Sequence, residues 1–145
     1  MKEITGDIWD YRKQGYVVVT TNGFVKANGD CVMGRGIALQ ARNRFKGLAK
    51  ALGTKINEGG NRVHVFESYK IITFPVKEVW WEPAKQWLIQ RSCQQLLNCL
   101  NDRTDKAFIP HAGCQNGKLD WETQVKPIFE QEFGNDDRII VVTYG

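Results

Sequence analysis

The stretch that leads from Tyr16 to Phe45 constrains the fold more than any other part of the sequence. The run YVVVTTN, residues 16–22, has the length and the β-branched composition of a buried strand. A loop that contains Gly29, Gly34 and Gly36 follows this run directly. Apolar residues at helical spacing come next, and the order of strand, glycine-rich loop and helix is typical of an α/β fold.

The helix after this loop is predicted from Ile37, Ala38, Ala41 and Phe45, which share one helix face. The first N–H groups of a helix lack internal partners, and the helix dipole places partial positive charge there. Glycine lets the backbone approach a phosphate closely. The loop therefore predicts a phosphate site, with a flexible turn into the helix as the open alternative.

Two well-known phosphate loops do not fit this segment. A Walker A loop would use the spacing of Gly29 and Gly34, but Arg35 stands in place of its Lys and Gly36 in place of its hydroxyl residue. A dinucleotide fingerprint would need a small residue where Leu39 stands. The loop therefore belongs to neither a metal-dependent nucleotide hydrolase nor a Rossmann fold.

Length and charge limit what the chain can be. The 145 residues, of which 42% are hydrophobic and 25% charged, predict one domain spanning residues 1–145. The N-terminal segment lacks an apolar signal region and no run has transmembrane length, so we expect a soluble, cytoplasmic monomer. The net charge of +4 is mild and scattered, which favours an anionic small molecule over sequence-specific nucleic-acid binding.

The cysteines predict neither a metal site nor a disulfide framework. No two of them form a C-x-x-C pair, and only two histidines are present to complete a ligand set. We therefore expect reduced thiols, no metal and no cofactor. The residues concerned are Cys31, Cys93, Cys99, Cys114, His64 and His111.

The middle of the chain predicts a hairpin followed by a helix. Residues 62–68 and 70–76 are expected to form neighbouring antiparallel strands. Residues 57–61, NEGGN, are expected to be a loop before them. A helix is expected to start at Pro83 and to end near Asn101. Its expected buried residues are Leu88, Leu96, Leu97 and Leu100.

The last third of the chain repeats the alternation of strand and helix. Residues 106–113 form a strand that runs into glycine, and residues 138–144 form the closing strand. Between them, Asp120 is a plausible N-cap, and Pro127 either kinks the helix or marks its true start. The apolar residues of this helix are Trp121, Val125, Ile128, Phe129 and Phe133. The alternation predicts an α/β/α layered fold with a mixed sheet.

A second glycine loop lies within HAGCQNGKLDW, residues 111–121. Like the first loop, it follows a strand, contains glycines (Gly113 and Gly117) and precedes a helix. Two such loops at the ends of neighbouring strands can embrace two linked phosphates from opposite sides. The pair predicts a diphosphate ligand, with two unrelated turns as the alternative.

Five motifs in order resemble the macro domain, an ADP-ribose-binding fold. They are GDIWDY, TTN, VMGRGIALQAR, FPVK and IPHAGCQNGKLDWE, and together they span essentially the whole chain. Their combination is similar to the branch of terminal ADP-ribose glycohydrolases and DNA ADP-ribosyl glycohydrolase antitoxins. The resemblance implies a three-layer α/β/α macro domain with a mixed sheet of about six strands.

The resemblance also implies roles for particular residues. Asp7 would accept a hydrogen bond from the adenine amino group, the amide of Ile8 would face the ring, and Asn22 would meet the distal ribose. Without the family, Asp7 is a solvated turn residue and Asn22 a strand-end cap. The first diphosphate loop would comprise Val32, Met33, Gly34, Arg35, Gly36, Ile37 and Ala38. The second would comprise Gly113, Cys114, Gln115, Asn116, Gly117, Lys118 and Leu119.

Lys77, in FPVK, is the residue that the resemblance assigns to catalysis together with Asn22. In the glycohydrolase branch this lysine reaches the distal ribose and takes part in cleavage at its anomeric carbon. It would act as a neutral amine if burial and nearby cations lower its pKa, or as a charged hydrogen-bond donor. The alternative is an ordinary surface lysine. Trp80 and Trp81 next to it form either an apolar wall or lid of the site or a plug in the core.

Two departures from the family pattern bear on activity. Gly117 stands where some glycohydrolases of the branch carry an acid, which weakens a covalent lysine route, and Asp120 is already explained as a helix cap. Residues 23–31 lengthen the first loop and alter which acceptor fits. The sequence predicts hydrolysis of an ADP-ribosyl linkage to protein or nucleic acid. A non-catalytic ADP-ribose-binding module and a phosphatase acting on ADP-ribose 1″-phosphate remain the alternatives.

Overall fold

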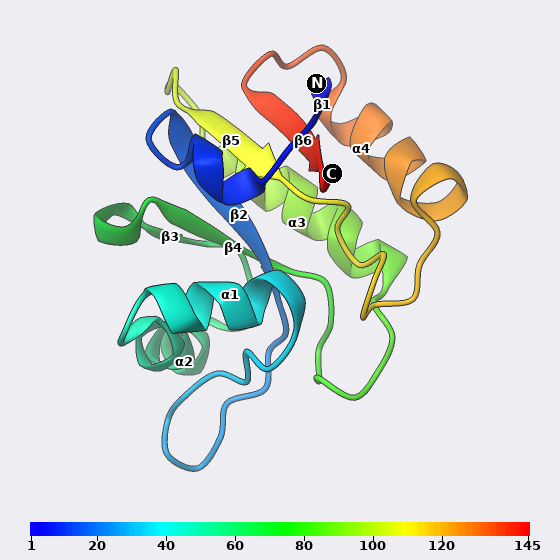
Figure 1. The fold of residues 1–145 in the computed structure, drawn as a ribbon. Helices are drawn as coiled ribbons and strands as arrows, with labels where there is room; N and C mark the ends of the chain where they lie inside the picture. Colours follow the sequence, from blue (N-terminus) through cyan, green and yellow to red (C-terminus); the bar gives the residue numbers. More distant parts are fainter.

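The computed structural model describes all residues, 1–145, and contains one six-stranded mixed sheet (Figure 1). The strand order is β1-β6-β5-β2-β4-β3, and only β3 and β4 pair antiparallel. The mixed sheet and the antiparallel pair predicted from the sequence are therefore confirmed. The strands are β1 Lys2–Thr5, β2 Gly15–Thr21, β3 His64–Phe66, β4 Ile71–Pro75, β5 Lys106–Ile109 and β6 Ile139–Thr143.

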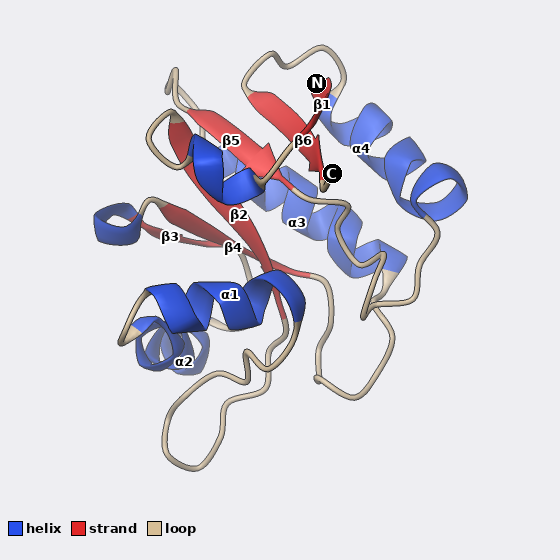
Figure 2. Cartoon of the chain, viewed as in Figure 1, coloured by secondary structure: helices blue, strands red, loops and turns tan.

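Four α-helices cover the two faces of this sheet (Figures 1 and 2). They are α1 Gly36–Arg44, α2 Leu48–Gly59, α3 Gln86–Cys99 and α4 Lys126–Phe133. The helices α1 and α2 lie on one face, and α3 and α4 lie on the other, which confirms the three-layer α/β/α class. Short 3-10 turns at η1 Ile8–Tyr11 and η2 Glu67–Tyr69 complete the fold.

The strand β2 shows how the sequence builds two cores at once. Successive side chains of a strand point to opposite faces. Tyr16 and Val18 belong to the apolar cluster under α3 and α4, whereas Val17 and Val19 belong to the cluster under α1 and α2. All four are buried, and a strand covered by helices on both faces reads as a continuous apolar run.

Two elements of the structure were not predicted from the sequence, and one predicted loop is partly helical. Helix α2 runs through residues 57–59, so the loop predicted at 57–61 is wrong for its first three residues. The start of α2 has no side-chain cap, and Gly53 and Thr54 lower its intrinsic helix propensity. It forms because Leu48 and Leu52 are buried beneath it. Strand β1, whose residues are largely exposed, was not predicted either.

The boundaries of α3 and α4 have local causes. Helix α3 begins at Gln86 and not at Pro83, because the N–H of Ala84 donates to Gly117 O (2.9 Å) and that of Lys85 to Val76 O (2.9 Å). The leucines predicted to be buried in this helix are buried, except Leu97, which is half-buried.

The predicted cap at Asp120 is confirmed. Its Oδ2 accepts from the N–H of Thr123 at 2.8 Å, at the start of a π-helical turn over Trp121–Val125. Helix α4 then starts at Lys126, which makes Pro127 its second residue. Pro127 therefore marks the start of the α-helix rather than a kink within it.

Gly53 of α2 allows the loop between β2 and α1 to lie against the helix. A Cβ at this position would collide with Gly29 O and would lie 3.1 Å from Cys31 N. The backbone of residues 29–31 therefore packs directly on α2.

Gly53→Ala should consequently destabilise the protein, although replacing glycine by alanine inside an exposed helix normally stabilises it by about 1 kcal/mol. We expect a loss of roughly 1–3 kcal/mol in the free energy of unfolding in urea, because the added methyl has no space. Gly59→Ala is the matched control, since a Cβ there would lie 3.5 Å from His64 Cε1, an ordinary contact. Equal effects of the two substitutions would contradict this account.

Candidate functional site

A cleft of about 1380 Å³ lies at the carboxyl ends of β2, β4, β5 and β6. The carboxyl ends of parallel strands meet at one edge of a sheet, where ligand sites of α/β proteins form. The connection from β2 to α1 and the connection from β5 to α4 supply most of its walls. The two glycine loops predicted from the sequence therefore lie on the same cavity.

Most of the residues predicted for the site line this cleft. They are Ile8, Asn22, Val32, Met33, Gly34, Arg35, Gly36, Ile37, Ala38, Lys77, Gly113, Cys114, Gln115, Asn116, Gly117 and Leu119. Asp7 and Lys118 are exposed and lie outside the lining, although their neighbours belong to it. One carboxylate oxygen of Asp7 accepts from the N–H of Trp9 at 3.0 Å and caps η1.

The first loop ends at the N-terminus of α1. The N–H groups of Gly36, Ile37 and Ala38 have no acceptor within the chain, as expected for the first turn of a helix. Gly36 has φ +56, a left-handed conformation that favours glycine. A Cβ at Gly34 would meet nothing within 4 Å, so this glycine faces open space.

The second loop approaches the first from the other side. The N–H of Leu119 donates to Gly113 O at 3.0 Å and closes the loop, which leaves the N–H groups of Gln115, Asn116 and Gly117 without an acceptor in the chain. A Cβ at Gly36 would lie only 3.1 Å from Asn116 Nδ2, so the two loops are in near contact. The cleft is thus bordered on both sides by unpaired N–H donors, which suit an anion.

Gly117 is fixed by packing. A Cβ here would collide with Gly113 O and would lie 2.7 Å from the Cβ of Ala84. The carbonyl of Gly117 also accepts from the N–H of Ala84 at the start of α3. An acidic side chain at position 117 therefore does not fit this backbone.

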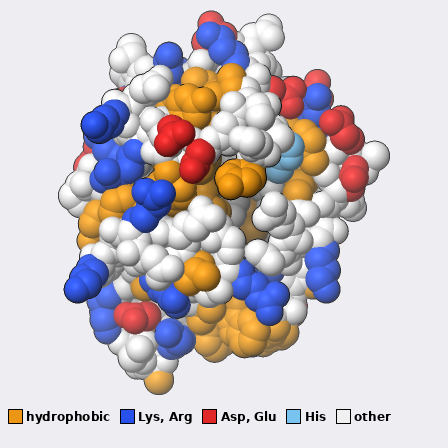
Figure 3. Space-filling view, viewed as in Figure 1, with side chains coloured by type: hydrophobic (Ala, Val, Ile, Leu, Met, Phe, Trp, Pro, Cys, Tyr) orange, Lys and Arg blue, Asp and Glu red, His pale blue; other side chains and the backbone are white.

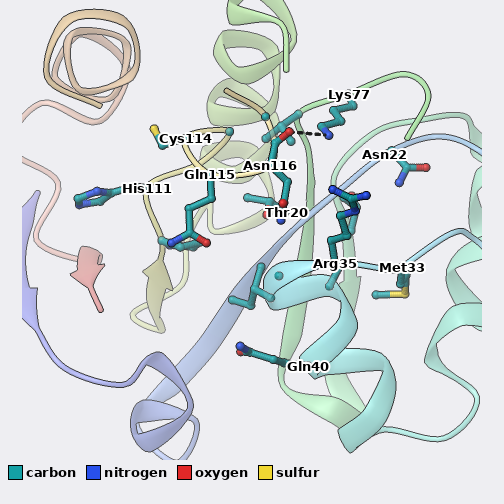
Figure 4. A pocket seen from close by; sticks show the side chains of 18 of the residues that line it. Thr20, Asn22, Met33, Arg35, Gln40, Lys77, His111, Cys114, Gln115 and Asn116 are labelled. Carbon is teal, nitrogen blue, oxygen red and sulfur yellow. Dashed lines mark hydrogen bonds between the residues drawn. The ribbon is translucent and has the colours of Figure 1, made fainter. Parts of the chain in front are cut away.

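Lys77 joins the segment after β4 to the second loop. Its Nζ donates to Asn116 O at 3.1 Å (Figure 4) and to Trp80 O at 3.4 Å. The side chain is half-buried. Burial lowers the pKa of Lys77, and the positive charges of Arg35 and Lys118 lower this pKa further. The amine is therefore more readily neutral than that of a solvated lysine.

The side chain of Asn22 forms hydrogen bonds with the loop that follows it. It is 9% exposed, and its Nδ2 donates to Val32 O at 3.0 Å while its Oδ1 accepts from the N–H of Phe24 at 2.8 Å. The side chain thus holds together the two ends of the segment 24–32. Nδ2 carries a second N–H, which remains free to donate.

Further residues line the cleft that the sequence analysis did not assign to the site. The ring of His111 stacks on Trp121 at 4.0 Å between centroids, and its Nε2 lies 3.0 Å from Thr143 Oγ1. Burial lowers the pKa of His111. The position of His111 at the strand-to-loop junction was a sequence signal that this residue could line the site. No such signal marked Thr20, Gln40 or Tyr144, which also line the cleft. Figure 4 labels Thr20 and Gln40.

The structure contains neither a metal-binding cluster nor a membrane-spanning helix. The structure contains no cluster of three His, Cys, Asp or Glu side chains suited to hold a metal ion. None of its helices has both the length and the apolar character of a membrane crossing.

The electrostatic coupling of Lys77 to its neighbours is directly testable. Arg35→Gln removes a positive charge that disfavours the protonated amine, so the pKa of Lys77 should rise toward the ordinary value of about 10.4. We expect a smaller rise for Lys118→Gln, since Arg35 contributes more than Lys118. An NMR titration of the lysine Cε and Nζ signals, assigned through Lys77→Arg, measures both. An unchanged pKa in Arg35→Gln would contradict the coupling.

Known proteins resemble this chain in sequence and fold. No protein-family model matches the sequence. Two curated proteins named DNA ADP-ribosyl glycohydrolase, from Mycobacterium bovis and Mycobacterium tuberculosis, are 30% identical to it over 101 residues. The match covers 63% of this chain and 29% of each relative, so the chain spans less than a third of the length of these proteins.

Solved structures extend the likeness to the whole chain. The macrodomain of Mycobacterium tuberculosis DarG has a TM-score of 0.81 and 26% identity, covering 99% of this chain and 95% of that one. Thermosipho africanus DarTG in complex with ADP-ribose has a TM-score of 0.79 at 18% identity, covering 100% of this chain and 42% of that one. The latter shows the fold alone. The chain therefore has the macrodomain fold, and in sequence and structure it is similar to the macrodomain of Mycobacterium tuberculosis DarG.

Proposed function

We propose that the cleft binds ADP-ribose with its diphosphate between the two glycine loops. The observation that carries this proposal is the near contact of the loops at Gly36 and Asn116, with unpaired N–H groups on both sides. Ordered N–H donors at a helix N-terminus are a common phosphate site. The adenine lies by Ile8, where the second carboxylate oxygen of Asp7 accepts from its amino group.

The distal ribose lies at the other end of the cleft, near Asn22 and Lys77. Both residues line the cavity, and the second N–H of Asn22 is available to a ribose hydroxyl. The cavity of about 1380 Å³ is larger than the 300–1,000 Å³ typical of small-molecule sites. It therefore has room for ADP-ribose and for part of the group to which the ribose is linked.

The reaction proposed is hydrolysis of the bond between the anomeric carbon of the distal ribose and a nucleobase of DNA. Water supplies the hydroxyl that ends on ADP-ribose, and its proton ends on the base. The name DNA ADP-ribosyl glycohydrolase of the curated relatives favours this acceptor over protein. The lowered pKa of Lys77 supports its participation as a neutral amine.

The absence of an acid in the second loop affects the route. Because a side chain at Gly117 does not fit, the acid of related glycohydrolases has no equivalent there. Asp120 lines the cleft, but its carboxylate is engaged by the N–H and hydroxyl of Thr123. Lys77 as a charged donor that stabilises the departing base is therefore the competing route.

Two other functions remain candidates, a non-catalytic reader of ADP-ribose and a phosphatase acting on ADP-ribose 1″-phosphate. Incubation with ADP-ribosylated single-stranded DNA, ADP-ribosylated protein and the 1″-phosphate separates them. We expect release of ADP-ribose from the DNA. Binding of ADP-ribose without turnover of any substrate would favour the reader, and release of phosphate alone would favour the phosphatase.

Gly34→Val should abolish ADP-ribose binding while leaving the thermal midpoint nearly unchanged. The added side chain enters open space and not the core, and it occupies the volume given to a phosphate. Calorimetric titration should show saturable binding near 1:1 for the parent protein without added metal. Gly34→Ala, the smaller substitution, should weaken binding less. Full affinity in Gly34→Val would place the diphosphate elsewhere.

Lys77→Ala should reduce turnover at least about 100-fold and change the Kd for ADP-ribose only modestly, because the loop N–H groups remain. Single-turnover release of ADP-ribose and calorimetric titration measure the two effects separately. Loss of both would mark Lys77 as a ligand clamp. If neither changes, Lys77 is a surface lysine and the hydrolase proposal loses its only candidate nucleophile.

A further inference from the structure

Three aromatic side chains at the mouth of the cleft have no role in the function proposed above. We call Phe24, Trp80 and Trp81 the aromatic rim. All three line the cavity, and Trp80 and Trp81 are 49% and 58% exposed. The rings of Phe24 and Trp81 lie 5.5 Å apart edge to face, and those of Trp80 and Trp81 lie 5.3 Å apart. The tryptophans therefore form a wall of the cleft and do not plug the core.

The rim is held in a fixed position. Phe24 starts a small hairpin, in which the N–H of Val32 donates to Phe24 O at 3.0 Å and Val25 pairs with Cys31. Asn22 ties both ends of this hairpin together. The N–H of Cys31 donates to Ala49 O on α2 at 3.0 Å. The long connection between β2 and α1 is thus an ordered support for an exposed aromatic ring.

The rim lies at the reactive end of the cleft. Trp80 O accepts from Lys77 Nζ, so the rim begins where the proposed distal ribose ends. The group attached to the anomeric carbon leaves the cleft on this side. In the space-filling view, apolar side chains gather at the lower edge, over the segment between β4 and α3, beside Lys and Arg side chains (Figure 3).

The charges around the rim are positive. Lys26, Arg35 and Lys77 line the cleft, and none forms a salt bridge. The acids of the two segments that carry the rim, residues 24–32 and 76–85, each lie within salt-bridge distance of a lysine. Lys85 Nζ lies 3.0 Å from Glu78 and 3.7 Å from Glu82, and Lys50 Nζ lies 3.5 Å from Asp30.

We propose that the aromatic rim stacks a base of the single strand next to the modified nucleotide, while Lys26 and Arg35 contact its phosphates. Aromatic faces combined with nearby cations are how proteins bind single strands without reading their sequence. An apolar peptide would use the aromatic rings but would leave the cations without a partner. The inference rests on the proposed function, because it takes the modified base to lie beside Lys77.

The test compares two substrates of the intact chain: an ADP-ribosylated single-stranded oligonucleotide and the ADP-ribosylated single nucleotide. In Trp81→Ala and Phe24→Ala we expect the KM for the oligonucleotide to rise about tenfold or more. The Kd for ADP-ribose should stay within twofold, since this ligand ends before the rim, and the KM for the single nucleotide should rise much less than that for the oligonucleotide, since it lacks the neighbouring base. Trp81→Phe keeps a stacking surface and should restore most of the affinity.

Trp87→Ala is the matched control. Trp87 is 49% exposed, like Trp80, but it lies on α3 and does not line the cleft. It should behave as the parent protein toward both substrates. A variant that fails to fold is recognised by its loss of ADP-ribose binding. In that case Trp81→Phe is the variant to compare with the parent protein.

The outcomes separate this inference from the proposed function. If the parent protein hydrolyses both substrates and the rim variants retain its KM for the oligonucleotide, the rim inference is wrong and the hydrolase stands. A rise in KM confined to an ADP-ribosylated peptide would overturn it in favour of a protein acceptor. If the parent protein hydrolyses nothing, the hydrolase fails, and the rim is judged by fluorescence quenching with unmodified oligonucleotide, which we expect to disappear in Trp81→Ala but not in Trp87→Ala.

Discussion

The close approach of the two glycine loops, at Gly36 and Asn116, is the constraint on which the site depends. The loops come from distant parts of the chain, and the parallel pairing of β2 with β5 brings their starting points together at one edge of the sheet. Because Gly36 has no side chain, the first turn of α1 can face the second loop with its N–H groups unpaired. Such donors cost free energy when dry and therefore favour an anion between them.

Local pattern was enough to predict most of the sheet and the position of α1. The β-branched residues of β2 predict a strand, and the helical spacing of the apolar residues in α1 predicts a helix. Helix α2 could not be predicted in this way, because its stability comes from burial of Leu48 and Leu52 against other elements. The start of α3 was set wrongly for a similar reason, since the hydrogen bonds of Ala84 and Lys85 to neighbouring segments are tertiary contacts.

The site shows the same division between local and tertiary information. Glycine spacing and the family resemblance predicted both loops, Asn22 and Lys77, and of these residues only Lys118 lies outside the lining of the cleft. The resemblance did not show that Asn22 would hold the hairpin that follows it, or that Gly53 of α2 would support that hairpin. For this reason the sequence left open whether Trp80 and Trp81 form a wall of the site or plug the core, and it did not predict the contact of Trp81 with Phe24.

Binding of ADP-ribose, as proposed above, would change the balance of charges around Lys77. In the free protein, burial and the charges of Arg35 and Lys118 lower the pKa of Lys77 and favour the neutral amine. A diphosphate bound between the loops would bring negative charge there, offset those cations and favour the protonated form. Under the proposed function, and since no acid fits at Gly117, a protonated Lys77 would be a cation placed to assist departure of the base. Within the proposed function, this balance of charges favours the route in which Lys77 acts as a charged donor over the route in which it acts as a nucleophile.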